Sequence, residues 1–168
     1  MVVQTPIAKV TRGAAKQEGV GLAPRGGRPS RGDLPTKMTQ DILWESAQRE
    51  VPPGMTKERY LAGFAKYLQS GPNKLIQIGN TVFMLEGRGP GVAELSVFSV
   101  DPPSALPQRI KAGANTARQM GYRRIVAFID SPALLQMLPQ LQMKMQVSQS
   151  AKQIGGEMVP MTRVDVDL

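Results

Sequence analysis

The sequence contains neither cysteine nor histidine, and each absence excludes a class of chemistry. Without cysteine the chain can form no disulfide and no thiolate metal site. Without histidine it lacks the commonest general base, the usual zinc ligand and any serine-histidine triad. Catalysis would therefore have to use carboxylates, lysine, tyrosine, backbone donors or water, and we expect no metal site.

Long hydrophobic runs are missing as well. No apolar run approaches the roughly 20 residues that a membrane-spanning helix needs. The first ten residues, MVVQTPIAKV, lack the hydrophobic core of a signal peptide. We therefore expect a protein without a membrane span that is not secreted through a signal peptide and that works, or assembles, inside a cell.

Aromatic residues make up only 5% of the chain, whereas hydrophobic residues make up 41% and include ten methionines. A chain of 168 residues with this composition can bury one aliphatic core, with methionine filling irregular gaps. The net charge is +8, which favours acidic partners: nucleic acid, an anionic cofactor or an acidic protein surface. Non-specific adhesion is the alternative meaning of this charge.

Residues 1–37 differ in composition from the rest, being rich in glycine and proline with no sustained apolar period. Residues 1–35 carry six cations against two anions, half of the net charge. We predict an extended basic arm over residues 1–37 and a folded domain over residues 38–168. A disordered tail is the alternative for such a composition. The predicted partner-binding residues of the arm are Lys9, Arg12, Lys16, Arg25, Arg28 and Arg31.

The folded part begins with two expected helices and continues with three expected strands. Thr39 and Thr56 are the candidate helix caps, the first for a helix over residues 40–49. The expected strands are 75–78, 81–86 and 92–100, with a tight turn at Gly79 and Asn80.

The stretch from Val92 to Asp130 is the centre of the predicted fold. It consists of an apolar strand, a helix ending at Gly121 and a second apolar strand over residues 125–129. Parallel neighbours need a crossover connection of this kind, so we predict a β-α-β unit in a mixed α/β (α+β) sheet. Ligands in such sheets lie beyond the carboxyl ends of the strands, here near residues 99–103.

The last part of the chain predicts a helix over residues 133–147 that Pro139 kinks or splits. A short helical end follows over residues 152–156, and residues 157–166 form one or two closing strands.

This order of elements resembles the GCN5-related N-acetyltransferases (GNAT), which transfer acyl groups from acyl-CoA. The residues that carry the resemblance are Val100-Asp101-Pro102 after the central strand, Gly121-Tyr122 after the long helix, the strand from Arg124, and the segment 152–157. The resemblance implies a GNAT-like mixed sheet, with a glycine-rich pyrophosphate loop at the head of the central helix. At that place this chain has Pro103-Ser104-Ala105-Leu106-Pro107-Gln108, with no glycine and two prolines that cannot donate.

The family also implies an acid and a base. The expected last helix has no tyrosine to act as the acid, and Glu86 and Glu94 lie on strands that could present a base. If acyl-CoA binds, the residues expected to hold it are Val100, Leu106, Gln108 and Arg109.

The altered loop and the basic arm together favour a non-enzymatic function. We interpret the chain as a structural assembly protein, resembling small virion proteins of tailed bacteriophages, that binds neighbouring subunits or DNA through its arm. This interpretation assigns no catalytic residue and no cofactor, and it places the protein in the virion or in the host cytoplasm during assembly. The alternative is an acetyl-CoA-dependent N-acyltransferase, and a third possibility is a nucleic-acid-binding protein that uses the arm.

Overall fold

The computed structural model describes residues 35–168. The six predicted partner-binding residues of the arm lie outside the described residues. The helices are α1 (Thr39–Ala47), α2 (Lys57–Gln69), α3 (Leu106–Gln119) and α4 (Pro132–Met137), with short 3-10 turns η2 (Pro103–Ala105) and η3 (Leu138–Leu141). The strands are β1 (Asn73–Ile78), β2 (Thr81–Gly87), β3 (Val92–Ser99), β4 (Arg124–Ile129), β5 (Met145–Ile154) and β6 (Glu157–Asp167).

The six strands form one sheet in the order β1-β2-β3-β4-β6-β5. All neighbours are antiparallel except β3 and β4, which are parallel and joined by α3. The predicted crossover and the α/β mixed-sheet class are therefore confirmed.

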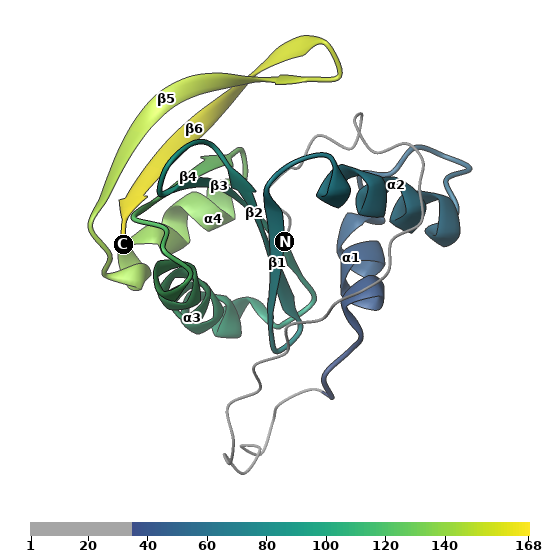
Figure 1. The fold of residues 1–168 in the computed structure, drawn as a ribbon, viewed down its shortest axis with the longest axis horizontal. Coiled ribbons are helices and arrows are strands. Elements are labelled where there is room, and N and C mark those ends of the chain that lie inside the picture. The colour runs from purple at the N-terminus through teal and green to yellow at the C-terminus, as the bar shows by residue number, and fades with distance from the viewer. Residues whose placement is uncertain (1–34) are drawn as a thin grey trace.

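Helices cover both faces of the sheet (Figure 1). One face packs against α1 and α2, where Tyr60 and Phe64 of α2 meet Phe98 of β3. The other face packs against α3 and α4, where Leu106 and Leu134 meet Val97 and Val164. Alternate residues of each strand serve the two cores, because successive side chains of a strand point to opposite faces.

Several local structures follow directly from the sequence. The Thr56 hydroxyl accepts a hydrogen bond from the Arg59 N–H at 3.2 Å, which caps α2 as predicted. Ile78 pairs with Thr81 around Gly79 and Asn80, which confirms the tight turn. Gly113 lets α3 approach the sheet closely, since a Cβ there would lie 3.0 Å from the Phe83 ring.

Other expectations were wrong. Thr39 does not cap α1; its hydroxyl instead donates to the Gln77 side chain of β1. The helix expected over residues 133–147 ends in η3 at Leu141, and Gln142 then takes a left-handed backbone with φ 51°. Residues 145–154, including the expected helical end from residue 152, form strand β5 because they pair along their whole length with β6.

The residues just before α1 are fastened to the β1–β2 turn. The Asn80 side chain accepts from the Lys37 N–H at 2.7 Å and donates to the Pro35 carbonyl at 3.2 Å, and Asn80 itself is 1% exposed. The segment 35–38 is therefore held by specific contacts. Within residues 35–168, none of the helices is both long and apolar enough to span a membrane.

Candidate functional site

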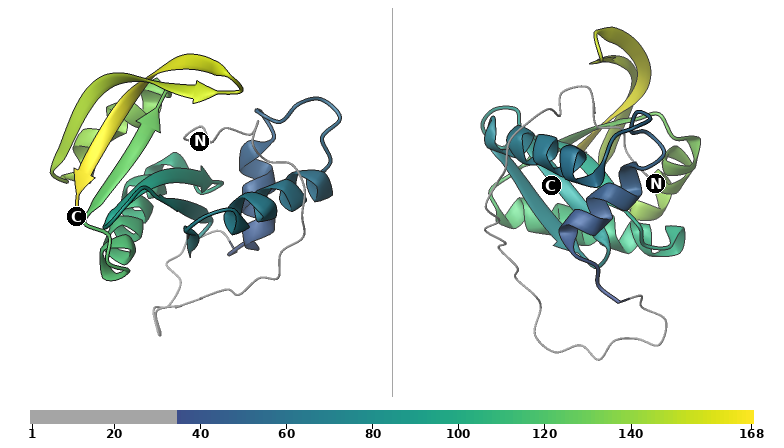
Figure 2. Two further views of the ribbon diagram at one scale, coloured as in Figure 1. Left: turned by 45° about the horizontal axis from the view of Figure 1, so that its top comes forward. Right: turned by 90° about the vertical axis from the view of Figure 1, so that its right-hand side faces the viewer.

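The two parallel strands of the crossover pair over only part of their length. Pairing joins residues 92–94 of β3 to residues 124–126 of β4 and goes no further. Residues 95–99 of β3 and residues 127–129 of β4 do not pair with each other, because the two strands diverge toward their carboxyl ends (Figure 2). This divergence frees backbone N–H and C=O groups at the end of the sheet where ligands of α/β proteins bind.

A network of buried polar groups fixes the chain where it leaves β3. The Asp101 side chain is 4% exposed, and its carboxylate accepts from the Asn80 N–H and from the Thr81 hydroxyl, each at 3.0 Å. Arg109 of α3 completes the set, because its Nε also donates to Asp101 at 3.0 Å. Three segments, the β1–β2 turn, the end of β3 and the first turns of α3, therefore share one carboxylate.

The start of α3 offers few free backbone donors. The Ala105 N–H bonds to the Pro102 carbonyl at 2.9 Å, and the Leu106 N–H bonds to the Pro103 carbonyl within η2. Pro103 and Pro107 have no N–H at all. Few backbone N–H groups are therefore open to a ligand at this end of α3.

The four residues expected to hold acyl-CoA lie in different surroundings. Leu106 is 2% exposed and belongs to the core on the α3 face, and Val100 packs against the core beneath α1 and α2. Gln108 is exposed on the first turn of α3. Arg109 is partly exposed beside it, with its guanidinium against Gly79. Their role in binding a donor stays a prediction.

The two glutamates expected as candidate bases are engaged in a paired cluster, which we call the Glu94 cluster: Tyr67, Glu86, Arg88, Glu94 and Lys152. Glu94 is 7% exposed; one carboxylate oxygen accepts from the Arg88 guanidinium at 2.6 Å and the other accepts from Lys152. Glu86 accepts from the Tyr67 hydroxyl and pairs with Arg88 at 3.2 Å. Partial burial, and then the hydrogen bond to Glu86, raise the pKa of Tyr67. Both carboxylates are therefore already paired with cationic side chains.

A second acidic pair lies at the carboxyl end of β4. Asp130 follows β4 directly, and Glu50 lies in the connection between α1 and α2. The pKa of Glu50 is raised from its usual 4.5, first by desolvation of its carboxyl and then by the negative charge of Asp130. Glu50 in turn contributes, after burial, to raising the pKa of Tyr60. Glu50 and Asp130 are both exposed, and the negative charge of Asp130 acts on the Glu50 carboxyl.

Sequence reasoning missed Glu50 and Asp130 as a pair. The signal available was the position of Asp130 immediately after an apolar strand, but nothing in the sequence brings the α1–α2 connection to it. No group of three acidic side chains in the described part of the chain could hold a metal ion.

Comparisons with known proteins give matches among solved structures alone. No family model and no curated protein matches this sequence. A structure assigned as a phosphinothricin N-acetyltransferase is 13% identical with a TM-score of 0.53, over 80% of this chain and 96% of that chain. An acetyltransferase from Bacillus subtilis, solved in complex with CoA, is 16% identical with a TM-score of 0.48, over 79% and 95% of the two chains. An IAA acetyltransferase from Bacillus cereus is 13% identical with a TM-score of 0.47, over 78% and 93%.

These matches correct two expectations. The interpretation as a non-enzymatic assembly protein is contradicted, because the structure matched with a TM-score of 0.53 is assigned as an N-acetyltransferase, and that match gives no support for a virion component. The expectation of no cofactor is contradicted by the same match, since an acetyltransferase uses an acetyl donor. The physical reason for the error lies in what the sequence can show. The prolines before α3 visibly remove backbone donors from the expected phosphate loop. The divergence of β3 and β4 depends on strand pairing, which the sequence does not show. At these identities the comparison establishes architecture: the chain has a GNAT-like fold.

Proposed function

We propose that this chain is an acyl-CoA-dependent N-acyltransferase. The observation that carries the proposal is the divergence of β3 and β4 after three paired residues, at the carboxyl end of the crossover. The fold supports the proposal, since the same architecture is found in the acetyltransferase with a TM-score of 0.53.

The donor would lie with its pantetheine arm between the diverging strands. That arm contains amide groups. Residues 95–99 of β3 pair with β2 on one side, and the backbone N–H and C=O groups on their other side, toward β4, are open to amides that bond as a strand would. The phosphates would lie near the start of α3. Because few backbone donors are free there, the side chains of Gln108 and Arg109 would bind them.

The acceptor amine would approach near Glu50, in the connection between α1 and α2, and Asp130, which follows β4. A protonated amine is attracted by the two carboxylates and must lose a proton before its lone pair attacks the thioester carbonyl. A carboxylate with a raised pKa accepts that proton more readily than an ordinary carboxylate, and the pKa of Glu50 is raised above 4.5 by desolvation and by Asp130. The amine nitrogen then forms the amide bond as the C–S bond breaks, and the second proton that the nitrogen loses passes to the sulfur, so CoA leaves as the thiol.

The absence of cysteine allows a direct test. Because the protein contributes no thiol, a thiol reagent detects released CoA without background. We expect thiol release from acetyl-CoA when the full chain is given a panel of primary amines. Acetyl-CoA at 100 times its Kd should also raise the free energy of unfolding by about 2.7 kcal/mol. The proposal would be refuted if no amine gave thiol release and millimolar acetyl-CoA gave no stabilisation.

The acidic pair provides matched variants for the reaction. Glu50→Gln should lower kcat, because the replaced group cannot accept a proton. Glu58→Gln is the control, since it removes an equal charge from an exposed position on the first turn of α2. Equal activity of the two variants would remove Glu50 from the mechanism and leave donor binding to be judged by the stabilisation measurement.

A further inference from the structure

The outer strand β5 has an edge that is not protected against pairing. It runs for ten residues, Met145–Ile154, without proline or glycine. Natural edge strands are kept apart by charges, prolines, bulges or short length. The only charged residue of β5 is Lys152, and its ammonium group is already engaged by Glu94. A long edge with no free charge is therefore open to another strand.

The hairpin turn identifies the backbone groups on this edge. Ile154 and Glu157 pair across a two-residue turn of Gly155 and Gly156, whose φ angles are 59° and 93°. In such a turn the flanking residues form a hydrogen-bonded pair, and the bonded pairs then alternate along an antiparallel ladder. Lys152 and Ser148 therefore bond to β6, whereas the N–H and C=O groups of Val147, Gln149 and Ala151 point outward. Pro160 of β6 lies opposite Ala151, at a position whose missing N–H leaves the β5 ladder intact.

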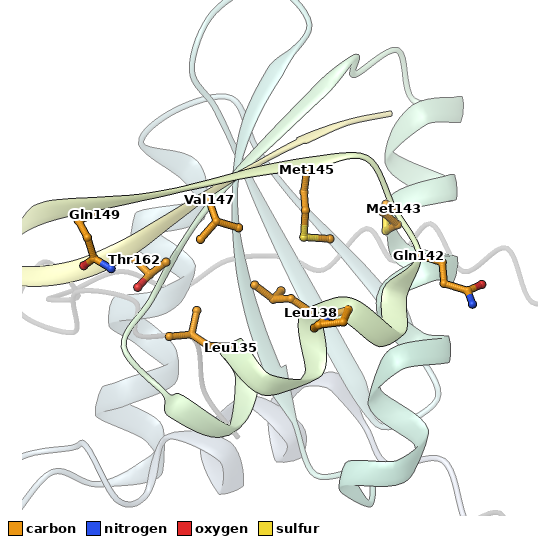
Figure 3. A pocket seen from close by; sticks show the side chains of 9 residues that line it. Leu135, Leu138, Gln142, Met143, Met145, Val147, Gln149 and Thr162 are labelled. Atoms are coloured by element: carbon orange, nitrogen blue, oxygen red, sulfur yellow. The ribbon is translucent and has the colours of Figure 1, made fainter.

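An apolar pocket lies beside the same edge (Figure 3). Its volume is about 460 Å³, and it lies between the α4–η3 segment and the β5–β6 hairpin. Val147 and Met145 of β5 point toward Leu135 and Leu138 of the helical segment. Val147 is 55% exposed, although it lies in the middle of this apolar surface. The open edge and the pocket thus form one continuous surface.

We propose that a second copy of this chain binds this surface, with its β5 antiparallel to the first β5 about a two-fold axis. An antiparallel strand pair is self-complementary, so the outward groups of residues 147, 149 and 151 in each copy bond to the other copy. No like charges meet, because Lys152 is turned away to Glu94. With Gln149 at the two-fold axis, Val147 of each copy lies opposite Ala151 of the other copy, and these two side chains are removed from water. The two sheets then form one continuous twelve-stranded sheet, and the two-fold symmetry closes the assembly at a dimer.

The proposal is tested by sedimentation equilibrium of the full chain over a wide range of concentration. We expect a mass twice that of one chain. Gln149→Pro should give a monomer, because it removes one outward N–H while every bond to β6 is kept. Val147→Lys should also give a monomer, since it adds an unpaired charge to the edge. Met38→Lys is the control, because Met38 is 65% exposed before α1, far along the chain from β5, and this variant should remain a dimer.

Amide hydrogen exchange identifies the interface and shows that the variants are folded. In the wild-type dimer the amides of Val147, Gln149 and Ala151 should be protected, and in Val147→Lys only the amides bonded to β6 should remain so. A wild-type chain that stays monomeric would overturn the proposal. A dimer that survives both β5 substitutions, or whose outward β5 amides exchange freely, would overturn it equally.

Discussion

The ammonium group of Lys152 on β5 donates to the carboxylate of Glu94 on β3, although β4 and β6 lie between those strands in the sheet. The ammonium also lies 5.2 Å from the centre of the Phe128 ring on β4. The curved β5–β6 hairpin makes this contact possible, because its far end bends over the sheet (Figure 1). One buried ion pair therefore connects the two halves of the sheet on either side of the strand divergence.

Removing Lys152 should destabilise the protein far more than removing a surface lysine. In Lys152→Met, the buried Glu94 carboxylate loses one of its two cationic partners and keeps Arg88, and removing one partner of a buried ion pair costs about 3 kcal/mol. Lys37→Met is the control, because the Lys37–Glu45 pair is 39% exposed on both sides and contributes about 0–1 kcal/mol. Urea unfolding of both variants measures the difference. Equal losses would show that Lys152 does not connect the sheet.

Residues with local signals were predicted well, and residues placed by long-range pairing were not. Gly79 and Asn80 carry their own turn chemistry, and the crossover strands have apolar runs of the right length, so both were predicted correctly. Residues 145–147 follow a run whose apolar spacing favours a helix. Their strand conformation comes from pairing with β6, which the local pattern cannot show.

The candidate site shows the same division. The sequence located the carboxyl end of β3 as the ligand end, because that follows from the order of the elements. It could not show that β3 and β4 separate after residue 94, which depends on where pairing stops. It also assigned Glu86 and Glu94 as candidate bases, because it could not show which cations pair with them. Lys152, a partner of Glu94, is 58 residues away from it in the chain.

Gly79→Ala should destabilise the protein more than Gly54→Ala. Both glycines have a left-handed backbone, with φ 60° and 82°, and a side chain in that conformation costs about 1–2 kcal/mol. At Gly79 the added Cβ would also lie 2.6 Å from Cζ of Arg109, whereas at Gly54 no atom lies within 4 Å. Thermal or urea unfolding of both variants gives the comparison. The extra loss of unfolding free energy at Gly79 should disappear when Arg109→Ala is added to Gly79→Ala. If the losses of the two single variants simply add in the double variant, the contact between these positions is contradicted.

The stability should respond to pH through Glu50. Its pKa is raised above 4.5 in the folded chain, first by desolvation and then by Asp130, so the folded state holds its proton more tightly than the unfolded state. The stability contributed by Glu50 is therefore lost as pH rises from 4.5 through the raised pKa. Glu50→Gln should be more stable than the wild type at neutral pH, and the two should converge at low pH.

Asp165 provides a control, because its pKa is shifted in the opposite direction from that of Glu50. The hydrogen bonds from Arg163, at 2.8 Å, are the first cause that lowers its pKa. Its contribution is present above the unfolded pKa and is lost as pH falls. Asp165→Asn should therefore be less stable than the wild type at neutral pH, and a Glu50→Gln curve of the same direction would contradict the assignment.

Arg109 should distinguish donors with phosphates from donors without them. If its guanidinium binds a phosphate of acetyl-CoA, Arg109→Gln should raise KM for acetyl-CoA about tenfold, the loss of one charge-assisted hydrogen bond. KM for acetyl-pantetheine, which has no phosphate, should not change. Arg118→Gln removes the same charge from an exposed position at the far end of α3, so it controls for long-range attraction of the anionic donor. Because Arg109 also supports Asp101, thermal unfolding must first show that the variant is folded at the assay temperature. A parallel rise in KM for both donors would mean that Arg109 acts through the Asp101 network rather than on the phosphate.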